Sequence, residues 1–222
     1  MRHFQLQLLL LTLTAAGTLA TLAQAADVRS IADAVDHHYN HLRSLQCEFT
    51  ETYTGLGMDR SESGTLWLKK PGKMRWEYRS PGGKLFVSDG KEAWFYVAGD
   101  QQVRKTEVKK LDDLRSPLAF LLGKTKLEKE LLGLSLAPDA APVTPGDVVL
   151  RGAPRNMAGR INQVVLEITP EDAISRIVIE SADGSSTAYQ LSDQKENVPV
   201  ADSLFQFKVP PGTEVIEGDF GQ

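Results

Sequence analysis

Apolar and polar residues alternate along most of the chain, in short runs rich in aromatic and β-branched residues. Turn residues separate these runs at intervals of about ten residues, a pattern typical of antiparallel strands. The predicted strands are 46–54, 65–70, 74–79, 85–88, 92–97, 103–108, 147–151, 161–169, 174–181, 187–192, 204–209 and 215–216. Asp89-Gly90 and Asp183-Gly184 predict hairpin turns. Residues 55–63 and 137–145 are rich in turn formers and predict loops.

Two segments have a helical pattern instead. Apolar residues recur at spacings of three and four after Asp27, a candidate N-cap, and predict an amphipathic helix: Val28, Ile31, Val35, Tyr39 and Leu42. Residues 111–136 place leucines among lysines and glutamates and predict two short helices. We therefore expect a mainly β domain of about ten antiparallel strands, with a leading helix and a helical insertion. Such strands close or curl into a barrel or a sandwich.

The first 25 residues predict a cleaved signal peptide. Arg2 begins a short basic start, an apolar run covers 6–22, and Ala23-Gln24-Ala25 is a small-x-small cleavage site. A membrane anchor is the alternative, but the run is short and thinned by threonines. We expect an exported, soluble product over 26–222 that forms a single domain.

Charge and cysteine content narrow the class of protein. The net charge is −4 and becomes −5 without the signal, since one base, Arg2, and no acid is removed. A mildly acidic chain does not favour a nucleic-acid partner. Cys47 is the single cysteine and is expected to be a small buried thiol. His37 and His41 share a helix face, but two ligands make half a metal site, and a solvated helix edge is the other reading.

Catalytic motifs are missing from the sequence, which contains no nucleophile elbow, zinc-binding helix motif, P-loop or dinucleotide fingerprint. We therefore predict that the protein is not an enzyme and uses no cofactor. Large apolar side chains are concentrated between Trp67 and Tyr96, where all three tryptophans lie. A filled sandwich core and a lined cavity share this composition, so composition leaves both open.

An ordered set of motifs resembles a known family. Residues 64–78, from Gly64 through Lys70-Pro71 to Tyr78, are similar to the signature of the periplasmic outer-membrane lipoprotein carrier LolA. Further similar pieces follow in order over nearly the whole predicted mature chain: 87–91, 94–96, 102–103, 116–118 with 121–122, Leu150 with Pro154, and 205–212 with Val215.

The resemblance implies an incomplete, strongly bent antiparallel β-barrel covered by short α-helices. It also implies a periplasmic carrier, expected to be a monomer, for triacylated or diacylated lipoproteins. Such a carrier takes its cargo from an inner-membrane ABC exporter and delivers it to an outer-membrane receptor. The implied wall of the lipid cavity comprises Phe49, Leu66, Leu68, Met74, Trp76, Phe86, Trp94 and Tyr96.

A lid near 115–133 is implied as well, with Leu118, Phe120, Leu121 and Leu122 as its apolar plug. The family usually has arginine before the signature proline, where it latches the lid through backbone carbonyls. Lys70 stands there instead, a point-charge donor without the planar fork, and implies a weaker latch. Arg75 is a second candidate donor. Glu51 stands where the family tends to have glutamine.

Three alternatives share this sequence pattern. An outer-membrane acceptor of the same fold would need a lipidated cysteine after the signal, where Ala26 stands. A lipid- or lipoprotein-sensing module that regulates an envelope signalling partner would typically carry an additional domain. A structural β-sandwich with a filled interior would have no cavity.

Overall fold

The structure is a computed structural model that describes residues 27–111, 126–155, 157 and 159–218. The predicted signal peptide lies outside the described residues, as do Leu118, Phe120, Leu121 and Leu122 of the predicted lid.

Helical periodicity correctly located the N-terminal helix, which covers residues 27–41. Val28, Val35, Tyr39 and Leu42 are buried on one side, as the spacing predicted. Asp27 is already helical, so it does not cap this helix. Two four-residue helices, α2 (Val108–Leu111) and α4 (Leu127–Glu130), flank the undescribed 112–125 segment.

Twelve strands make up the described sheet. They are β1 (Ser44–Gly55), β2 (Met58–Lys69), β3 (Lys73–Ser80), β4 (Gly82–Asp89), β5 (Glu92–Val97), β6 (Gln102–Glu107), β7 (Leu131–Leu136), β8 (Val148–Pro154), β9 (Ile161–Ile168), β10 (Ile174–Ser181), β11 (Ser186–Glu196) and β12 (Glu214–Glu217). Their order is β12-β6-β5-β4-β3-β2-β1-β11-β10-β9-β8-β7. Each neighbouring pair is antiparallel except β12 with β6, which is parallel.

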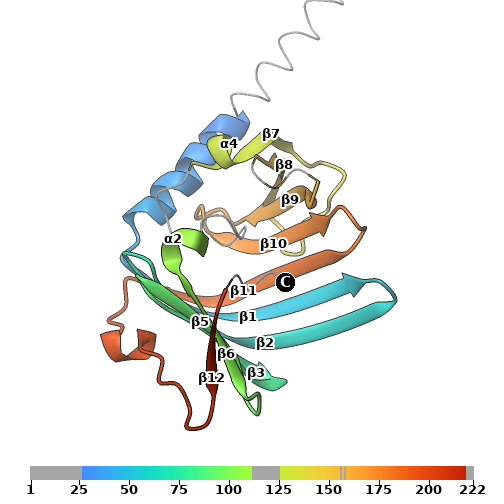
Figure 1. Cartoon of the computed structure of the whole chain (residues 1–222). Coiled ribbons are helices and arrows are strands. Elements are labelled where there is room, and N and C mark those ends of the chain that lie inside the picture. Colours follow the sequence, from blue (N-terminus) through green and yellow to red (C-terminus); the bar gives the residue numbers. More distant parts are fainter. Residues whose placement is uncertain (1–26, 112–125, 156, 158, 219–222) are drawn as a thin grey trace, which may run out of the picture.

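The sheet is open and strongly bent. Its two ends, β12 and β7, are not neighbours in the strand order of the described residues. In Figure 1, β5, β6 and β12 run across the direction of β1 and β2, while β7 to β10 curl around the other side. This arrangement confirms the predicted incomplete antiparallel barrel. The predicted hairpins at Asp89-Gly90 and Asp183-Gly184 are also present, joining β4 to β5 and β10 to β11.

Three segments differ from the sequence expectations. The predicted loop 55–63 is mostly strand, because β2 begins at Met58 and pairs with β1 along its whole length. The second insertion helix ends at Glu130, since Leu131 and Leu132 pair with Pro154 and Ala153 of β8. The predicted strand 204–209 is instead the end of a 3-10 helix, η1 (Asp202–Phe205), followed by irregular chain.

The main core lies between the N-terminal helix and one face of the sheet, which we call the inner face. Val28, Val35 and Tyr39 of the helix pack in one cluster with Leu66 of β2 and Ile177 of β10. The helix therefore covers strands from both halves of the sheet, and its apolar stripe ties them together.

A smaller apolar cluster lies on the opposite, outer face. Val87 and Val103 are fully buried there, and η1 lies against β3 and β4 with Phe205 only 1% exposed. Arg75 donates to the carbonyl of Leu204 at 3.2 Å. The chain after β11 is thus fastened to the outer face before it adds β12 to the edge of the sheet.

Candidate functional site

The inner face carries a continuous row of large apolar side chains. Residues directly opposite one another in antiparallel strands point to the same face. The row runs through five neighbouring strands: Cys47, Leu66, Trp76, Phe86 and Phe95. Leu68 pairs with Met74 on the same face, and Phe49 packs edge-on against Trp76 with ring centroids 4.7 Å apart. The structure therefore brings together six of the eight predicted wall residues.

Trp94 and Tyr96 lie on the outer face, contrary to the sequence prediction. They pair with Val87 and Val103 and contact Phe207 of the C-terminal segment, with centroids about 6 Å apart (6.1 and 6.0 Å). Because Ser88 pairs with Ala93 across the hairpin, Phe95 is the inward residue of β5. Sequence reasoning missed Phe95, although counting the register across Asp89-Gly90 would have found it.

Burial along the inner face is graded. Leu66 and Trp76 are fully covered, whereas Tyr78, Phe86, Phe95 and Tyr189 are half-buried. Tyr189 lies on β11, contacts Trp76 edge-on at 5.8 Å, and was not predicted. The inner face thus combines a packed part under the N-terminal helix with an aromatic part that is partly open to contact.

The N-terminal helix also fixes the point where the chain leaves the predicted lid. The Asp36 carboxylate accepts the backbone N–H of Leu127 at 3.0 Å, in the position that an N-cap would occupy for α4. Burial raises the pKa of Asp36, which is also close to Asp33. Arg29 adds an ion pair to Glu128 at 3.3 Å. These contacts tie α4 to the helix that covers the inner face.

Within the described part of the chain, Lys70 contacts the N-terminal helix. Its ammonium donates to the backbone carbonyl of Tyr39, near the end of the N-terminal helix. The hydroxyl of Tyr39 accepts the N–H of Ile174 at 2.9 Å, and burial raises its pKa. Contacts with residues 112–125 lie outside the described part of the chain. Arg75, the second candidate donor, lies on the outer face and pairs with Glu77 at 2.8 Å.

A polar network lies on the inner face beyond the aromatic row. Glu51 and Glu62 are cross-strand partners, and both are buried. The hydroxyl of Tyr78 donates to Glu51 at 2.6 Å, and burial together with the Glu51 charge raises the pKa of Tyr78. Lys84 pairs with Glu62, and its ammonium lies 3.9 Å from the centre of the Tyr78 ring. The two carboxylates are therefore each matched by a donor.

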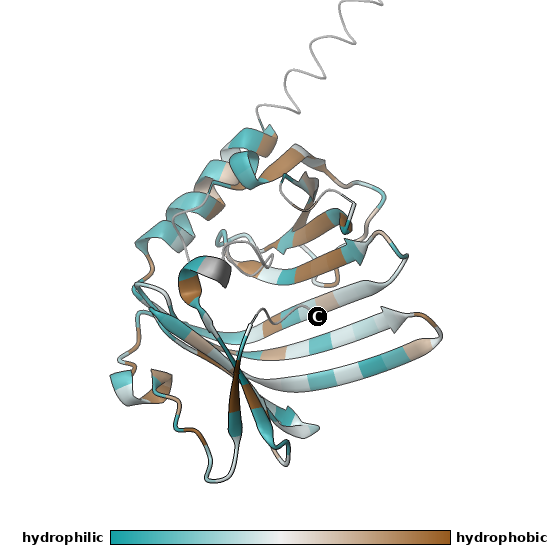
Figure 2. Cartoon of the chain, in the orientation of Figure 1, coloured by the Kyte–Doolittle hydropathy of each residue, from teal (hydrophilic) through white to brown (hydrophobic). Residues whose placement is uncertain are grey.

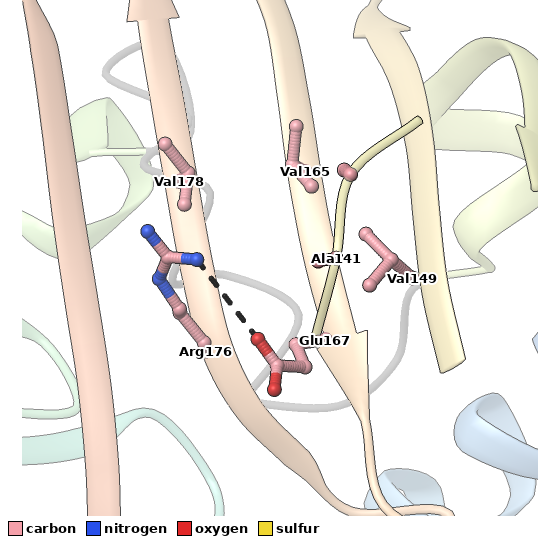
Figure 3. Close-up of a pocket in the computed structure, with 7 residues that line it drawn as sticks. Ala141, Val149, Val165, Glu167, Arg176 and Val178 are labelled. Atoms are coloured by element: carbon pink, nitrogen blue, oxygen red, sulfur yellow. Dashed lines mark ion pairs between the residues drawn. The ribbon is translucent and has the colours of Figure 1, made fainter. Parts of the chain in front are cut away.

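A small pocket lies on the outer face between β8, β9, β10 and the 137–147 loop (Figure 3). Its apolar lining surrounds Glu167, which is 3% exposed and lies 3.9 Å from Arg176. Glu167 also accepts the N–H of Thr144 at 2.9 Å. These contacts hold the loop against the sheet, on the opposite face from the aromatic row.

The single cysteine and the histidines of the N-terminal helix take part in the packing and polar contacts of the fold. Cys47 is buried, as predicted, and burial raises the pKa of its thiol to about 12. His38 lies 2.7 Å from Glu196 of β11, and His41 Nδ1 lies 2.7 Å from the carbonyl of His37. Within the described ranges, no group of three or more metal-binding side chains comes together. No helix in those ranges is long and apolar enough to span a bilayer.

The fold and the inner face together define a class of protein: a half-open β-barrel with an apolar, helix-covered inner surface. Comparison with known proteins supplies the family. Residues 40–208 match the family described as outer membrane lipoprotein carrier protein LolA, and the chain belongs to it. A Chromobacterium violaceum outer-membrane lipoprotein carrier protein is 29% identical over 93% of this chain and 97% of its own length. One from Alkalilimnicola ehrlichii is 32% identical over 83% of each.

Solved structures of more distant proteins share the fold. An uncharacterised conserved protein from Thermus thermophilus superposes with a TM-score of 0.51, at 16% identity, over 88% of this chain and 100% of its own. The Mycobacterium tuberculosis lipoprotein LppX gives a TM-score of 0.50 at 15% identity, over 79% and 98%. At these identities the likeness concerns the fold alone.

Proposed function

We propose that this protein binds the acyl chains of lipoproteins on its inner face and carries them across the periplasm. The observation that supports this most directly is the graded inner face. Phe86, Phe95 and Tyr189 continue the buried row of Leu66 and Trp76 but remain partly exposed. An ordinary core would be covered throughout, whereas a carrier needs apolar surface that cargo can reach. The names of the relatives, outer-membrane lipoprotein carrier proteins, support the same cargo.

The free energy of exposing acyl chains explains why a carrier is needed. Three chains hold about 45 methylenes, and at about 0.8 kcal/mol each their transfer into water costs roughly 35 kcal/mol. The carrier must offset most of this cost and still release its cargo. A sheet that does not close on itself suits both demands, because its inner face shields the chains incompletely.

The lid is part of the proposal. We place Leu118, Phe120, Leu121 and Leu122 over the inner face of the empty protein, where lipid would displace them. The segment that contains them starts after α2 and ends at α4, which Asp36 holds against the N-terminal helix. Lys70 would latch the closed state indirectly, because its contact with Tyr39 fixes the helix that α4 contacts.

The partners follow from this task. Cargo would be triacylated or diacylated lipoproteins received from an inner-membrane ABC exporter and delivered to an outer-membrane receptor. The predicted signal peptide is consistent with a periplasmic location. Binding and release of acyl chains require no bond to be made or broken, so the proposal assigns no catalytic role and no cofactor to any residue.

Co-purification of cargo tests the proposal. The protein would be isolated from envelope extracts, and bound lipoprotein would be detected by mass spectrometry of the acylated N-terminal peptides. Phe86→Ser removes an aromatic ring from the inner face, and Leu85→Ser is its matched control on the outer face of the same strand. We expect cargo to be lost from Phe86→Ser and retained by Leu85→Ser. Phe120→Glu in the lid should also lower the bound fraction. Absence of lipoprotein from the wild-type protein would refute the proposal.

A further inference from the structure

The turn between β1 and β2 presents two large apolar side chains to solvent. Leu56 is 71% exposed and Met58 is 63% exposed, and both stand at the very end of the longest hairpin of the sheet. Figure 2 shows this turn at the right of the molecule, coloured as apolar, whereas the parts of β1 and β2 that lead to it are mostly polar in colour. We call residues 55–58 the hairpin tip.

Leucine is an unusual residue for the backbone conformation at position 56. Gly55 pairs with Met58, so the turn has two residues, and Leu56 and Gly57 have φ values of 52° and 76°. Positive φ at both positions defines a type I′ turn, which favours Asn-Gly, Asp-Gly or Gly-Gly. A branched apolar side chain in this conformation weakens the turn by roughly tenfold relative to glycine. Since the Leu56 side chain is mostly in solvent, packing within the molecule does not offset that cost.

Aromatic and charged side chains lie at the base of the hairpin tip. Tyr53 and Arg60 are cross-strand partners, and the guanidinium lies 5.7 Å from the centre of the tyrosine ring. Arg60 is 58% exposed and lies 3.8 Å from Glu62. Met58 lies two residues nearer the turn than Arg60, so the two side chains share one face of β2. The tyrosine–arginine pair thus lies next to the two exposed apolar residues, on the side of the tip that leads into the sheet.

The tip is also fixed in place. A side chain on Gly55 would come within 2.5 Å of the Cβ of Ser185, in the turn between β10 and β11. Glycine at this position therefore lets two hairpins pack closely at the same end of the sheet. By contrast, the space around Gly57 is open to at least 4 Å. Leu56 and Met58 are therefore exposed at the end of a hairpin that packs against the turn between β10 and β11.

We propose that the hairpin tip inserts Leu56 and Met58 into the surface of a lipid bilayer, with Tyr53 and Arg60 at the level of the headgroups. Tyrosine and arginine prefer the membrane–water interface, where an apolar body and a polar end are both satisfied. Arg60 would favour anionic headgroups by charge. Burial of two such side chains corresponds to roughly a hundredfold gain in partition, enough for brief contact and too little for permanent attachment. The inference does not depend on cargo binding by the inner face.

Vesicle flotation tests the proposal. The purified wild-type protein would be mixed with vesicles of phosphatidylethanolamine containing a minor fraction of phosphatidylglycerol, and the bound fraction measured after flotation. The test variant combines Leu56→Asn with Met58→Thr, since asparagine suits a type I′ turn and threonine suits a strand. The control is Leu132→Thr, which removes another exposed leucine from β7, at the far edge of the sheet.

We expect the partition coefficient of the double variant to fall at least tenfold, with a denaturation midpoint no lower than that of the wild type. The control should bind like the wild type. Flotation of the double variant at the wild-type level, or absence of wild-type flotation, would overturn the proposal. Cargo co-purification would be measured on the same preparations. Its failure in the wild type, with flotation intact, would refute the carrier function and leave the membrane contact standing.

Discussion

The carboxylate of Asp36 accepts the backbone N–H of Leu127, 91 residues further along the chain, at 3.0 Å. The first residue of α4 is thus capped by a side chain from the N-terminal helix and not by its own neighbour Lys126. The contact couples the element that covers the inner face to the end of the proposed lid.

Removal of this cap should loosen α4. We expect Asp36→Ala to lower the free energy of unfolding by about 1 kcal/mol, as for other lost helix caps. Hydrogen exchange at the Leu127 amide should become faster at the same time. Asp36→Asn retains an acceptor oxygen and should keep exchange slow. Equal exchange rates in all three proteins would show that the contact does not hold α4 in solution.

Glu51 and Glu62 face each other on neighbouring strands, where like charges are destabilising. Glu51→Gln should raise the free energy of unfolding by up to about 1 kcal/mol, because glutamine still accepts the hydroxyl of Tyr78. Glu62→Gln should lower it, since Lys84 then loses its partner. Urea denaturation at neutral pH measures both. Changes of the same sign would contradict the assigned pairing.

Gly64 is required by close packing of the backbone. A Cβ at this position would lie 2.0 Å from the carbonyl oxygen of Glu77 and 2.9 Å from the ring of Phe49. Gly64→Ala must therefore push β3 away from β2 and disturb the inner face, and we expect a loss of roughly 1–3 kcal/mol. Gly218→Ala meets nothing within 4 Å and serves as the control, with a change below about 0.5 kcal/mol. Thermal unfolding of the two variants tests the difference.

Because the thiol of Cys47 is buried, the free energy of unfolding should decrease at alkaline pH. Its pKa is about 12 in the folded protein, against 9.0 for an unperturbed thiol. Between these values the unfolded chain loses the proton first, so the stabilisation is complete below about pH 9 and falls as the pH rises. We expect the loss of stability on going to about pH 10 to be about 1 kcal/mol smaller in Cys47→Ala. Identical pH profiles would show that the thiol is not protected. Slow labelling of native Cys47 by a thiol reagent offers an independent measurement.

The fold class was predictable because binary patterning and turn residues are local signals. The stripe from Val28 to Leu42 and the hairpin at Asp89-Gly90 each depend on a few consecutive residues. Leu131 was misassigned because its spacing from Leu127 suits a helix, whereas pairing with Pro154 of β8 decides its conformation. Partners that are distant in sequence leave no trace in local periodicity.

The candidate site was less predictable for the same reason. Trp94 and Tyr96 have the size expected of a cavity wall, but the register of β4 with β5 turns them outward. Phe205 and Phe207 alternate like strand residues, yet Phe205 is buried at the end of η1 and Phe207 packs against the rings of Trp94 and Tyr96. Local sequence does not indicate that these two residues belong to a segment that covers the outer face of the sheet. Residue type located the aromatic region, and register determined which residues face inward.

The position of β1 in the middle of the sheet has a consequence for biogenesis. Strands β1 to β6 follow one another as hairpins, so each can pair with the strand before it as soon as it has been synthesised. The other edge of β1 pairs with β11, where Phe49 meets Leu191, more than 130 residues later. Until that strand arrives, a twelve-residue edge remains available to other chains. Folding of this protein should therefore be slowest, and most in need of a holding chaperone, in the interval before the second half of the sheet is delivered.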